Sequence, residues 1–246
     1  MKRKLKNVTL VAVATTEVEA TVSALKYSIR GLDFQEVLLV SHYDPSPDLE
    51  IYRHVEIKPF SSVKDWGEFV VFDLHRHIST SHIVLVHADG FVINPEKWSD
   101  DFLKYDYIGA PWPLPSDNVS FRDYYGNIVR MGNSVSLRSL RILQLPEKLG
   151  LDWGSAHQSL FHEDGFLCVQ SRHILQKHGI EYAPFSVALN FSREKTLPEN
   201  KDILPFAFHQ WSGQNRKYPC FGKRKDLFYK IKRSVKALFN SYAKNH

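Results

Sequence analysis

Cysteines and long hydrophobic runs are scarce in this chain of 246 residues. The two cysteines, Cys168 and Cys220, are too few for a disulfide-stabilised scaffold, which favours a reducing cytosol. No run of about 18 apolar residues occurs, so the sequence predicts no membrane-spanning helix. The basic N-terminus is followed only by a short apolar run over 8–14, which predicts a first strand and not a secretory signal. No period of roughly 20 to 50 residues occurs, which excludes a repeat protein.

Acidic residues are nearly absent from the C-terminal end. Residues 216–246 hold ten Lys or Arg and one acid, Asp226, a net charge of +9. The remaining residues hold 22 basic and 26 acidic side chains, a net charge of −4. The formal charge of +5 therefore comes from the tail, and it does not indicate that the domain as a whole binds nucleic acid. We predict one domain over 1–215 and a separate basic tail over 216–246.

Strands and helices alternate in the N-terminal half. Buried-type apolar runs predict strands at 8–14, 35–41 and 82–86, and helical spacing of apolar residues predicts helices over 18–29, ended by Gly31, and 62–79. This alternation predicts an α/β fold in which helices cover a parallel sheet. Ligands bind beyond the carboxyl ends of the strands in such sheets, and the segment 87–90, HADG, lies there.

The second half is less regular. The segment 106–115, DYIGAPWPLP, is rich in proline and aromatic residues and predicts a loop of fixed shape. Residues 131–134 are expected to lead into a short helix that carries Leu137 and is closed by Pro146. Further expectations are a helix over 164–178 with Gly179 at its end, an extended segment over 183–191 and an aromatic-rich element over 205–211.

The frame His-x-Asp-Gly-Phe occurs at 87–91 and again at 162–166, in two different settings. In the first copy Asp89 follows a buried strand, and Gly90 permits close approach of the backbone to a ligand. A carboxylate there can hold a divalent cation that bridges nucleotide phosphates, and His87 can be a second ligand. The alternative is that Asp89 caps a turn and His87 is packed in the core.

The second copy places Glu163 and Asp164 at the start of a helix. The positive end of the helix dipole is expected to hold a carboxylate ionised. An ionised carboxylate beside a sugar hydroxyl can act as a general base. Acids at helix starts are also ordinary capping residues, so this alternative stays open.

Five further residues are candidate ligand contacts. His209, within the segment FAFHQW, is either a packed histidine or a metal ligand. Lys64 and Arg138 can each meet a diphosphate, or they are simply solvated. Thr15 and Thr16 follow the first strand, where a nucleotide base or ribose would contact the sheet, although they can equally cap the next helix.

Residues 87–112, HADGFVINPEKWSDDFLKYDYIGAPW, resemble the signature of an uncharacterised group of bacterial glycosyltransferase-like domains found among surface-polysaccharide genes. The resemblance continues in order through GNSVSLRS (132–139), HEDGFLC (162–168), HGIEYAPFSVALNFSRE (178–194) and LPFAFHQW (204–211), and covers about residues 8–212. It implies a GT-A-like α/β fold with a mostly parallel, Rossmann-type central sheet flanked by helices. The nucleotide-sugar-binding half would span about 1–112, and the acceptor-binding half 113–215.

The resemblance also implies the transfer of a sugar from a nucleotide-sugar donor to a glycan or lipid-linked acceptor. Asp89 would hold the donor diphosphate and a divalent cation, Mn²⁺ or Mg²⁺, to which His87 and His209 would contribute. Asp164 would be the general base of an inverting enzyme, and Glu163 would contact donor or acceptor hydroxyls.

Two features depart from the family's pattern. The usual motif is Asp-x-Asp, whereas this chain has His87-x-Asp89, which leaves metal dependence open. Ser134 and Val135 stand where the family usually shows Gly-Gly-Phe, and side chains there would crowd a backbone approach to the sugar. A non-catalytic nucleotide- or glycan-binding module is therefore one alternative. A sugar nucleotidyltransferase is another, although the segment 15–20, TTEVEA, lacks the Gly-rich basic loop such enzymes usually have.

The tail places Leu227, Phe228, Ile231, Val235 and Leu238 near helical spacing among lysines. This pattern predicts a basic amphipathic helix on an anionic membrane surface, at about 1 kcal/mol per well-placed cation. It suits a lipid-linked acceptor and a cytoplasmic protein that is peripheral on the inner face of the membrane. The alternatives are a helix packed against the domain and nucleic-acid binding.

Overall fold

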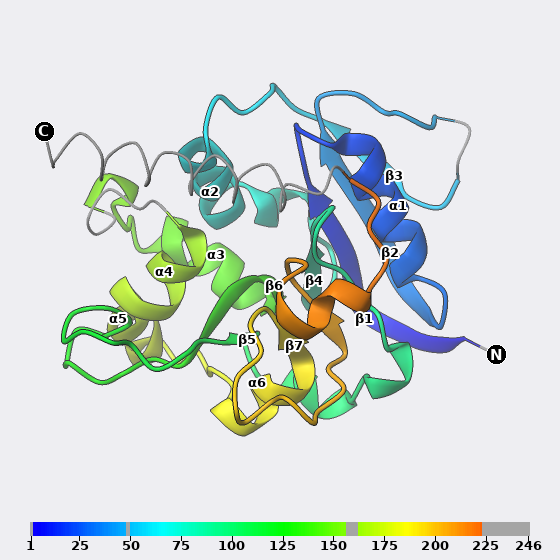
Figure 1. Cartoon of the computed structure of the whole chain (residues 1–246). Helices are drawn as coiled ribbons and strands as arrows, with labels where there is room; N and C mark the ends of the chain where they lie inside the picture. Colours follow the sequence, from blue (N-terminus) through cyan, green and yellow to red (C-terminus); the bar gives the residue numbers. More distant parts are fainter. Residues whose placement is uncertain (1, 48–49, 156–161, 223–246) are drawn as a thin grey trace, which may run out of the picture.

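Within residues 2–47, 50–155 and 162–222, which the computed structural model describes, six strands form the central sheet in the order β3-β2-β1-β4-β6-β5 (Figure 1). The first four strands run parallel, and β6 lies antiparallel between β4 and β5. The strands are β1 Arg3–Val13, β2 Leu32–Ser41, β3 Arg53–Glu56, β4 His82–Val86, β5 Tyr107–Pro111 and β6 Met131–Ser139, and a separate pair joins β7 Ser192–Arg193 to β8 Ala207–Phe208.

Helices cover both faces of this sheet. The helices are α1 Val18–Ser28, α2 Val63–Phe72, α3 Leu140–Lys148, α4 Glu163–Gly165, α5 Arg172–Lys177 and α6 Phe185–Phe191, and a π-helical turn, Phe166–Gln170, joins α4 to α5. Short 3-10 turns lie at Leu74–His77, Pro95–Lys97, Asp100–Lys104, Trp153–Ser155 and Gly213–Lys217. None of the helices in the described ranges is long and apolar enough to cross a membrane.

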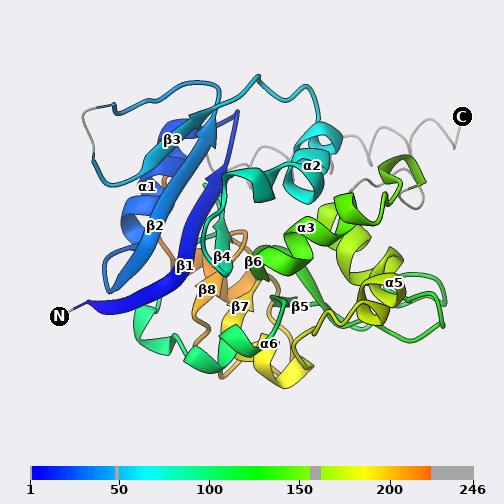
Figure 2. The same cartoon turned by 180° about the vertical axis from the view of Figure 1, so that it is seen from behind.

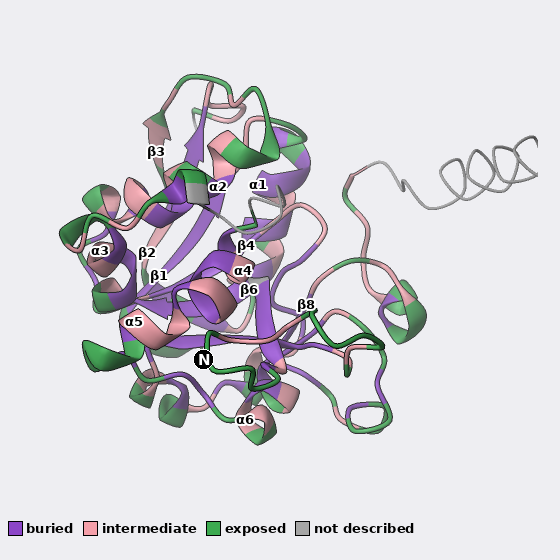
Figure 3. Cartoon of the chain, turned by 90° about the vertical axis from the view of Figure 1, so that its left-hand side faces the viewer, coloured by how far each residue is buried: buried purple, intermediate pink, exposed green. Residues whose placement is uncertain are grey.

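Side chains of each strand alternate between the two faces, because successive strand residues point to opposite sides. In β1, Leu10 and Ala12 belong to the larger core, which includes α1, whereas Val11 and Val13 belong to the core formed with α2 and α3. Figure 2 shows α1 behind the sheet and α2 and α3 in front of it. The central strands are accordingly buried, while the outer helices also carry exposed residues (Figure 3).

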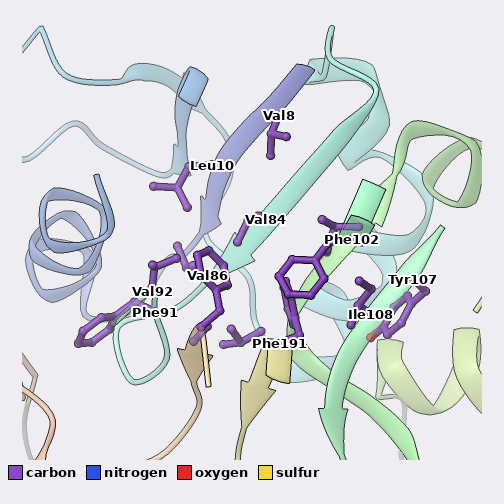
Figure 4. Packing of buried hydrophobic residues seen from close by; sticks show 14 of the residues in the cluster. Val8, Leu10, Val84, Val86, Phe91, Val92, Phe102, Tyr107, Ile108 and Phe191 are labelled. Carbon is purple, nitrogen blue, oxygen red and sulfur yellow. The ribbon is translucent and has the colours of Figure 1, made fainter. Parts of the chain in front are cut away.

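The larger core joins the two halves of the chain. Phe91 and Phe102 pack in it with Phe191, which comes from the second half, beside Val84 and Val86 of β4 (Figure 4). The rings of Phe102 and Phe191 meet edge to face at 5.3 Å. The two predicted halves therefore share one hydrophobic core, and the predicted α/β class with a mostly parallel, helix-flanked sheet is confirmed.

The predicted loop over 106–115 is wrong, because it contains the fully buried strand β5. A Cβ atom added to Gly109 would lie 1.8 Å from the carbonyl oxygen of Gly132. Glycine at this position permits close pairing of β5 with β6. Composition alone does not distinguish such a glycine-containing strand from a loop. Residues 131–139 form strand β6, which pairs with β5, so the helix expected after residue 134 begins only at Leu140. This helix, α3, is not closed by Pro146 but continues to Lys148.

The extended segment predicted over 183–191 is also wrong. The Pro184 carbonyl accepts the N–H groups of Val187 and Ala188 at the start of α6, and Ala188 and Phe191 are buried on one face of the helix.

Gly179 does end α5, with φ of +80°. Gly31 instead serves packing, since a Cβ there would lie 2.5 Å from Pro95 Cγ. Strand β3 was not predicted from the sequence, and the tail from residue 223 onward lies outside the described residues.

Candidate functional site

The turn after β4 places Asp89 at the carboxyl edge of the sheet. The His87 N–H donates to the Gly90 carbonyl at 2.7 Å, and the Gly90 N–H donates back at 3.2 Å. This turn leaves the Asp89 side chain 46% exposed. Because β1 pairs in parallel with β4, Thr15 and Thr16 follow β1 at the same edge. The structure thus groups these predicted ligand contacts, and their binding roles stay predictions.

Gly90 is required by packing. A Cβ atom there would lie 2.6 Å from Val135 Cγ2 and 2.8 Å from His209 Cδ2. The sequence predicted that a ligand approaches the backbone closely at Gly90. In the structure the side chains of His209 and Val135 make this close approach.

The segment 208–210 lies along this turn and brings His209 to Asp89. The Gln210 N–H donates to the Asp89 carbonyl at 2.7 Å, and His209 Nε2 lies 3.5 Å from Asp89 Oδ1. Burial opposes the charge of both groups, but their mutual contact outweighs it. That contact raises the pKa of His209 and holds the pKa of Asp89 well below its usual range. The pair therefore favours imidazolium and carboxylate.

A buried polar network behind His209 fixes its position. Asn215 Nδ2 lies 2.9 to 3.2 Å from the carbonyl oxygens of Arg193, Glu194, His209 and Gln210. Arg193 Nε donates to Asn215 Oδ1 at 3.0 Å, and its side chain is buried. Glu194 and His209 are thereby held side by side, although Arg193, Glu194 and Asn215 were not candidates from the sequence.

Asp164 enters the site from α4. Its Oδ2 accepts a hydrogen bond from the Asn133 N–H at 3.1 Å, and its Oδ1 accepts one from the Gly165 N–H at 2.8 Å. Burial first, and then the charge of Glu163, raise the pKa of Asp164 to about 7. Burial thus opposes the ionised carboxylate that the sequence predicted at this helix start.

Asn133 links Asp164 to a second carboxylate. It is buried with φ of +87°, in the left-handed region that few residues other than glycine adopt. Its Nδ2 donates to Glu194 Oε2, and its carbonyl accepts the Tyr107 hydroxyl at 2.9 Å. Strained residues of this kind persist where surrounding contacts hold them, and they concentrate at functional sites. The sequence analysis noted this asparagine only as part of the stretch GNSVSLRS, and gave it no role of its own.

The charges of Asp89, Glu194 and Asp164 all act on His209 and raise its pKa. We call Asp89, Asn133, Asp164, Glu194 and His209 the carboxylate–histidine cluster. The charges of the two aspartates of the doubled His-x-Asp-Gly-Phe frame thus act on one imidazole from different halves of the chain.

Arg138 and Glu163 form a buried ion pair, with Arg138 NH2 2.9 Å from Glu163 Oε1 and side-chain exposures of 0% and 3%. Arg138 Nε also donates to Ser136 Oγ at 2.9 Å. Neither charged group reaches solvent, so the diphosphate contact predicted for Arg138 and the hydroxyl contact predicted for Glu163 are not supported. Their role is to hold α4 against β6.

His87 is half-buried beside the cluster, with its ring 5.5 Å from the rings of Trp66 and His209. Burial, together with the charge of His209, lowers the pKa of His87 to about 4, so its imidazole is neutral. Among the described residues, no three His, Cys, Asp or Glu side chains converge in a way that could hold a metal ion. His87, Asp89 and His209 do not form such a three-residue group in this arrangement, and divalent-cation binding by these residues stays a prediction.

Lys64 lies apart from the cluster. It lines a surface hollow of about 370 Å³ together with Glu68, Phe72 and Trp153, between α2 and residues 151–154. The diphosphate contact of Lys64 stays a prediction.

The fold and cluster together define a mostly parallel α/β protein with a carboxylate–histidine group at the carboxyl edge of its sheet. The chain belongs to the family described as "Protein of unknown function (DUF5672)", whose model matches residues 52–209. No curated protein matches this chain.

Two solved structures are distantly similar. One is a glycosyltransferase involved in the glycosylation of the major capsid of PBCV-1, with 14% identity, a TM-score of 0.45 and coverage of 85% of this chain and 95% of that one. The other is the bifunctional IspDF from Campylobacter jejuni, with 10% identity and a TM-score of 0.36 over 55% of this chain. The match spans 41% of the length of IspDF.

Proposed function

We propose that this protein is an inverting glycosyltransferase that moves a sugar from a nucleotide-sugar donor to a glycan or lipid-linked acceptor. The observation that supports this proposal is the contact of Asp89 with His209 at the edge of the sheet where α/β proteins bind ligands, with the charge of Asp164 acting on the same imidazole. An inverting displacement needs one group for the attacking hydroxyl and another for the leaving diphosphate. Asp164 and the Asp89–His209 pair supply two such groups.

In the proposed reaction, the acceptor oxygen attacks the anomeric carbon and forms the new glycosidic bond. The bond from that carbon to the diphosphate oxygen breaks, and its electron pair stays on the diphosphate. Asp164, held by the Asn133 N–H, takes the proton of the acceptor hydroxyl. The imidazolium form of His209 offsets the negative charge that develops on the diphosphate.

The test is a panel of uridine, guanosine and thymidine diphosphate sugars, each with and without manganese, in which donor hydrolysis and sugar transfer are measured. We expect turnover of at least one donor. Asp164→Asn should lower transfer by roughly 10²- to 10⁴-fold, while donor affinity measured by calorimetry is retained. Asp101→Asn, whose side chain is 73% exposed outside the cluster, is the matched control and should keep wild-type activity. Full transfer by Asp164→Asn would remove Asp164 as the base.

A non-catalytic nucleotide- or glycan-binding module is the second candidate. It is favoured by Val135, whose buried side chain lies against Gly90 where the related pattern has glycine. Donor binding without turnover for every sugar, with manganese present, would support this module. Formation of a nucleotide sugar from a nucleoside triphosphate and a sugar phosphate would instead identify a nucleotidyltransferase.

A further inference from the structure

The hairpin that joins β5 to β6 presents two exposed aromatic rings. Tyr124 and Tyr125 are 72% and 61% exposed. The Tyr124 ring stacks on His173 of α5 at 4.3 Å and 18°, and the Tyr125 ring lies edge-on to both, at 5.3 Å and 6.1 Å. We call Tyr124, Tyr125 and His173 the aromatic platform. The hairpin, residues 113–130, lies beside α5 in both views (Figures 1 and 2).

Hydrogen bonds within the hairpin order this platform. Asp123 Oδ1 accepts from the N–H groups of Tyr125 and Asn127 at 3.0 Å and 2.9 Å, and Arg122 NH1 donates to the Gly126 carbonyl at 3.1 Å. At its base, Phe121 stacks on Trp112 at 4.8 Å. Because the rings are so exposed, they contribute little buried area to the fold. Rigid, pre-organised tyrosines instead offer contact area at a low entropic cost of binding.

The platform lies within reach of a polymer bound at Asp164. His173 follows Asp164 by nine residues, and a nearly continuous helical run through α4, the π-helical turn and α5 connects them. Nine residues of helix correspond to about 13 Å. A chain of a few sugar units that presents a hydroxyl to Asp164 can therefore extend to the platform.

The charged side chains around the platform are already engaged. The Asp123 carboxylate is bound to backbone N–H groups, Arg122 is bound to Gly126, and Arg172 lies over the Tyr182 ring at 4.0 Å. Among the described residues, the surface is therefore aromatic and polar at its rim, with Arg122 and Arg172 both engaged within the protein. A neutral sugar ring complements such a surface, because it has an apolar C–H face and a rim of hydroxyls. An anionic lipid or a nucleic acid requires cations instead.

We propose that the aromatic platform is an acceptor subsite, which binds a sugar residue of a neutral glycan chain at a distance from the reacting hydroxyl. This inference rests on the proposed function, because it assigns the acceptor of that same site.

The experiment measures binding of the labelled full-length protein to immobilised linear neutral oligosaccharides of increasing length. The wild type should bind the longer members more tightly than the monosaccharides. Tyr124→Ala should weaken this binding roughly five- to thirtyfold. Tyr124→Phe keeps the ring and should bind like the wild type. Val119→Ser alters a 65% exposed residue of the same hairpin and should also bind like the wild type.

Three outcomes would overturn the proposal: no oligosaccharide binding by the wild type, equal affinity in Tyr124→Ala, or binding to phosphatidylglycerol vesicles that Tyr124→Ala abolishes. Thermal unfolding of each variant shows whether the fold is kept. A wild type that hydrolyses no donor would contradict the proposed function, whereas the oligosaccharide binding tests the platform separately.

Discussion

Asp164 accepts two backbone hydrogen bonds, yet burial and the neighbouring Glu163 raise its pKa to about 7. A protonated carboxyl group cannot accept the proton of an acceptor hydroxyl. The proposed base is therefore active only in the fraction of molecules in which Asp164 is ionised, and this fraction grows as the pH rises through 7.

We expect the transfer rate to rise with pH, with a midpoint of about 7. Glu194→Gln removes a negative charge that raises the pKa of Asp164, so it should move the midpoint to lower pH. The measurement is kcat against pH for both proteins, with Glu199→Gln, an exposed acid of the same segment, as the control. A midpoint that stays in place in Glu194→Gln would show that Glu194 does not act on the base.

The buried pair of Arg138 and Glu163 predicts a stability effect. Glu163→Gln leaves the Arg138 guanidinium buried without its counter-charge, which should lower the free energy of unfolding by about 3 to 5 kcal/mol. Urea unfolding measures the change. Glu199→Gln, which breaks the more exposed pair with Arg130, should change stability little. Equal effects of the two substitutions would mean that the buried pair has no special structural role.

At the scale of elements, β5 and β6 depend on glycine for their close contact. A Cβ on Gly109 would meet the backbone of Gly132, which cannot turn aside as a side chain can. Proline and glycine made the segment 106–115 resemble a loop, because composition does not show which strand a segment will pair with.

Gly109→Ala should therefore separate the two strands and lower the free energy of unfolding by about 1 to 3 kcal/mol. Gly165→Ala is the matched control, since the nearest atom to its added Cβ, in His162, is 4.0 Å away. Both are compared by urea unfolding. Equal free energies of unfolding for Gly109→Ala and Gly165→Ala would contradict this prediction, because they would show that β5 and β6 accept a methyl group at Gly109 without loss of stability.

At the scale of the whole molecule, the neutral-to-acidic domain and the basic tail differ in charge. Residues 216–246 carry a net charge of +9, against −4 for the rest. This asymmetry predicts that the protein binds anionic membranes through the tail, in keeping with a lipid-linked acceptor.

We expect the full-length protein to sediment with phosphatidylglycerol vesicles and not with phosphatidylcholine vesicles. The triple substitution K223Q/R224Q/K225Q should weaken this binding by roughly two orders of magnitude, at about 1 kcal/mol for each cation lost. Added salt should weaken the binding of the wild type. Vesicle binding that is unchanged by these substitutions would show that residues 223–225 do not make the membrane contact.

The sequence by itself determined the α/β class, the parallel strands of the first half and the position of Asp89 after β4, because hydrophobic periodicity and strand ends are local features. Only the tertiary structure decided that His209 lies 3.5 Å from Asp89, that Arg138 and Glu163 face each other inside the protein, and that Asn133 joins Asp164 to Glu194. These contacts join residues 25 to 120 positions apart, and the pKa values they set depend on burial, which local sequence does not specify.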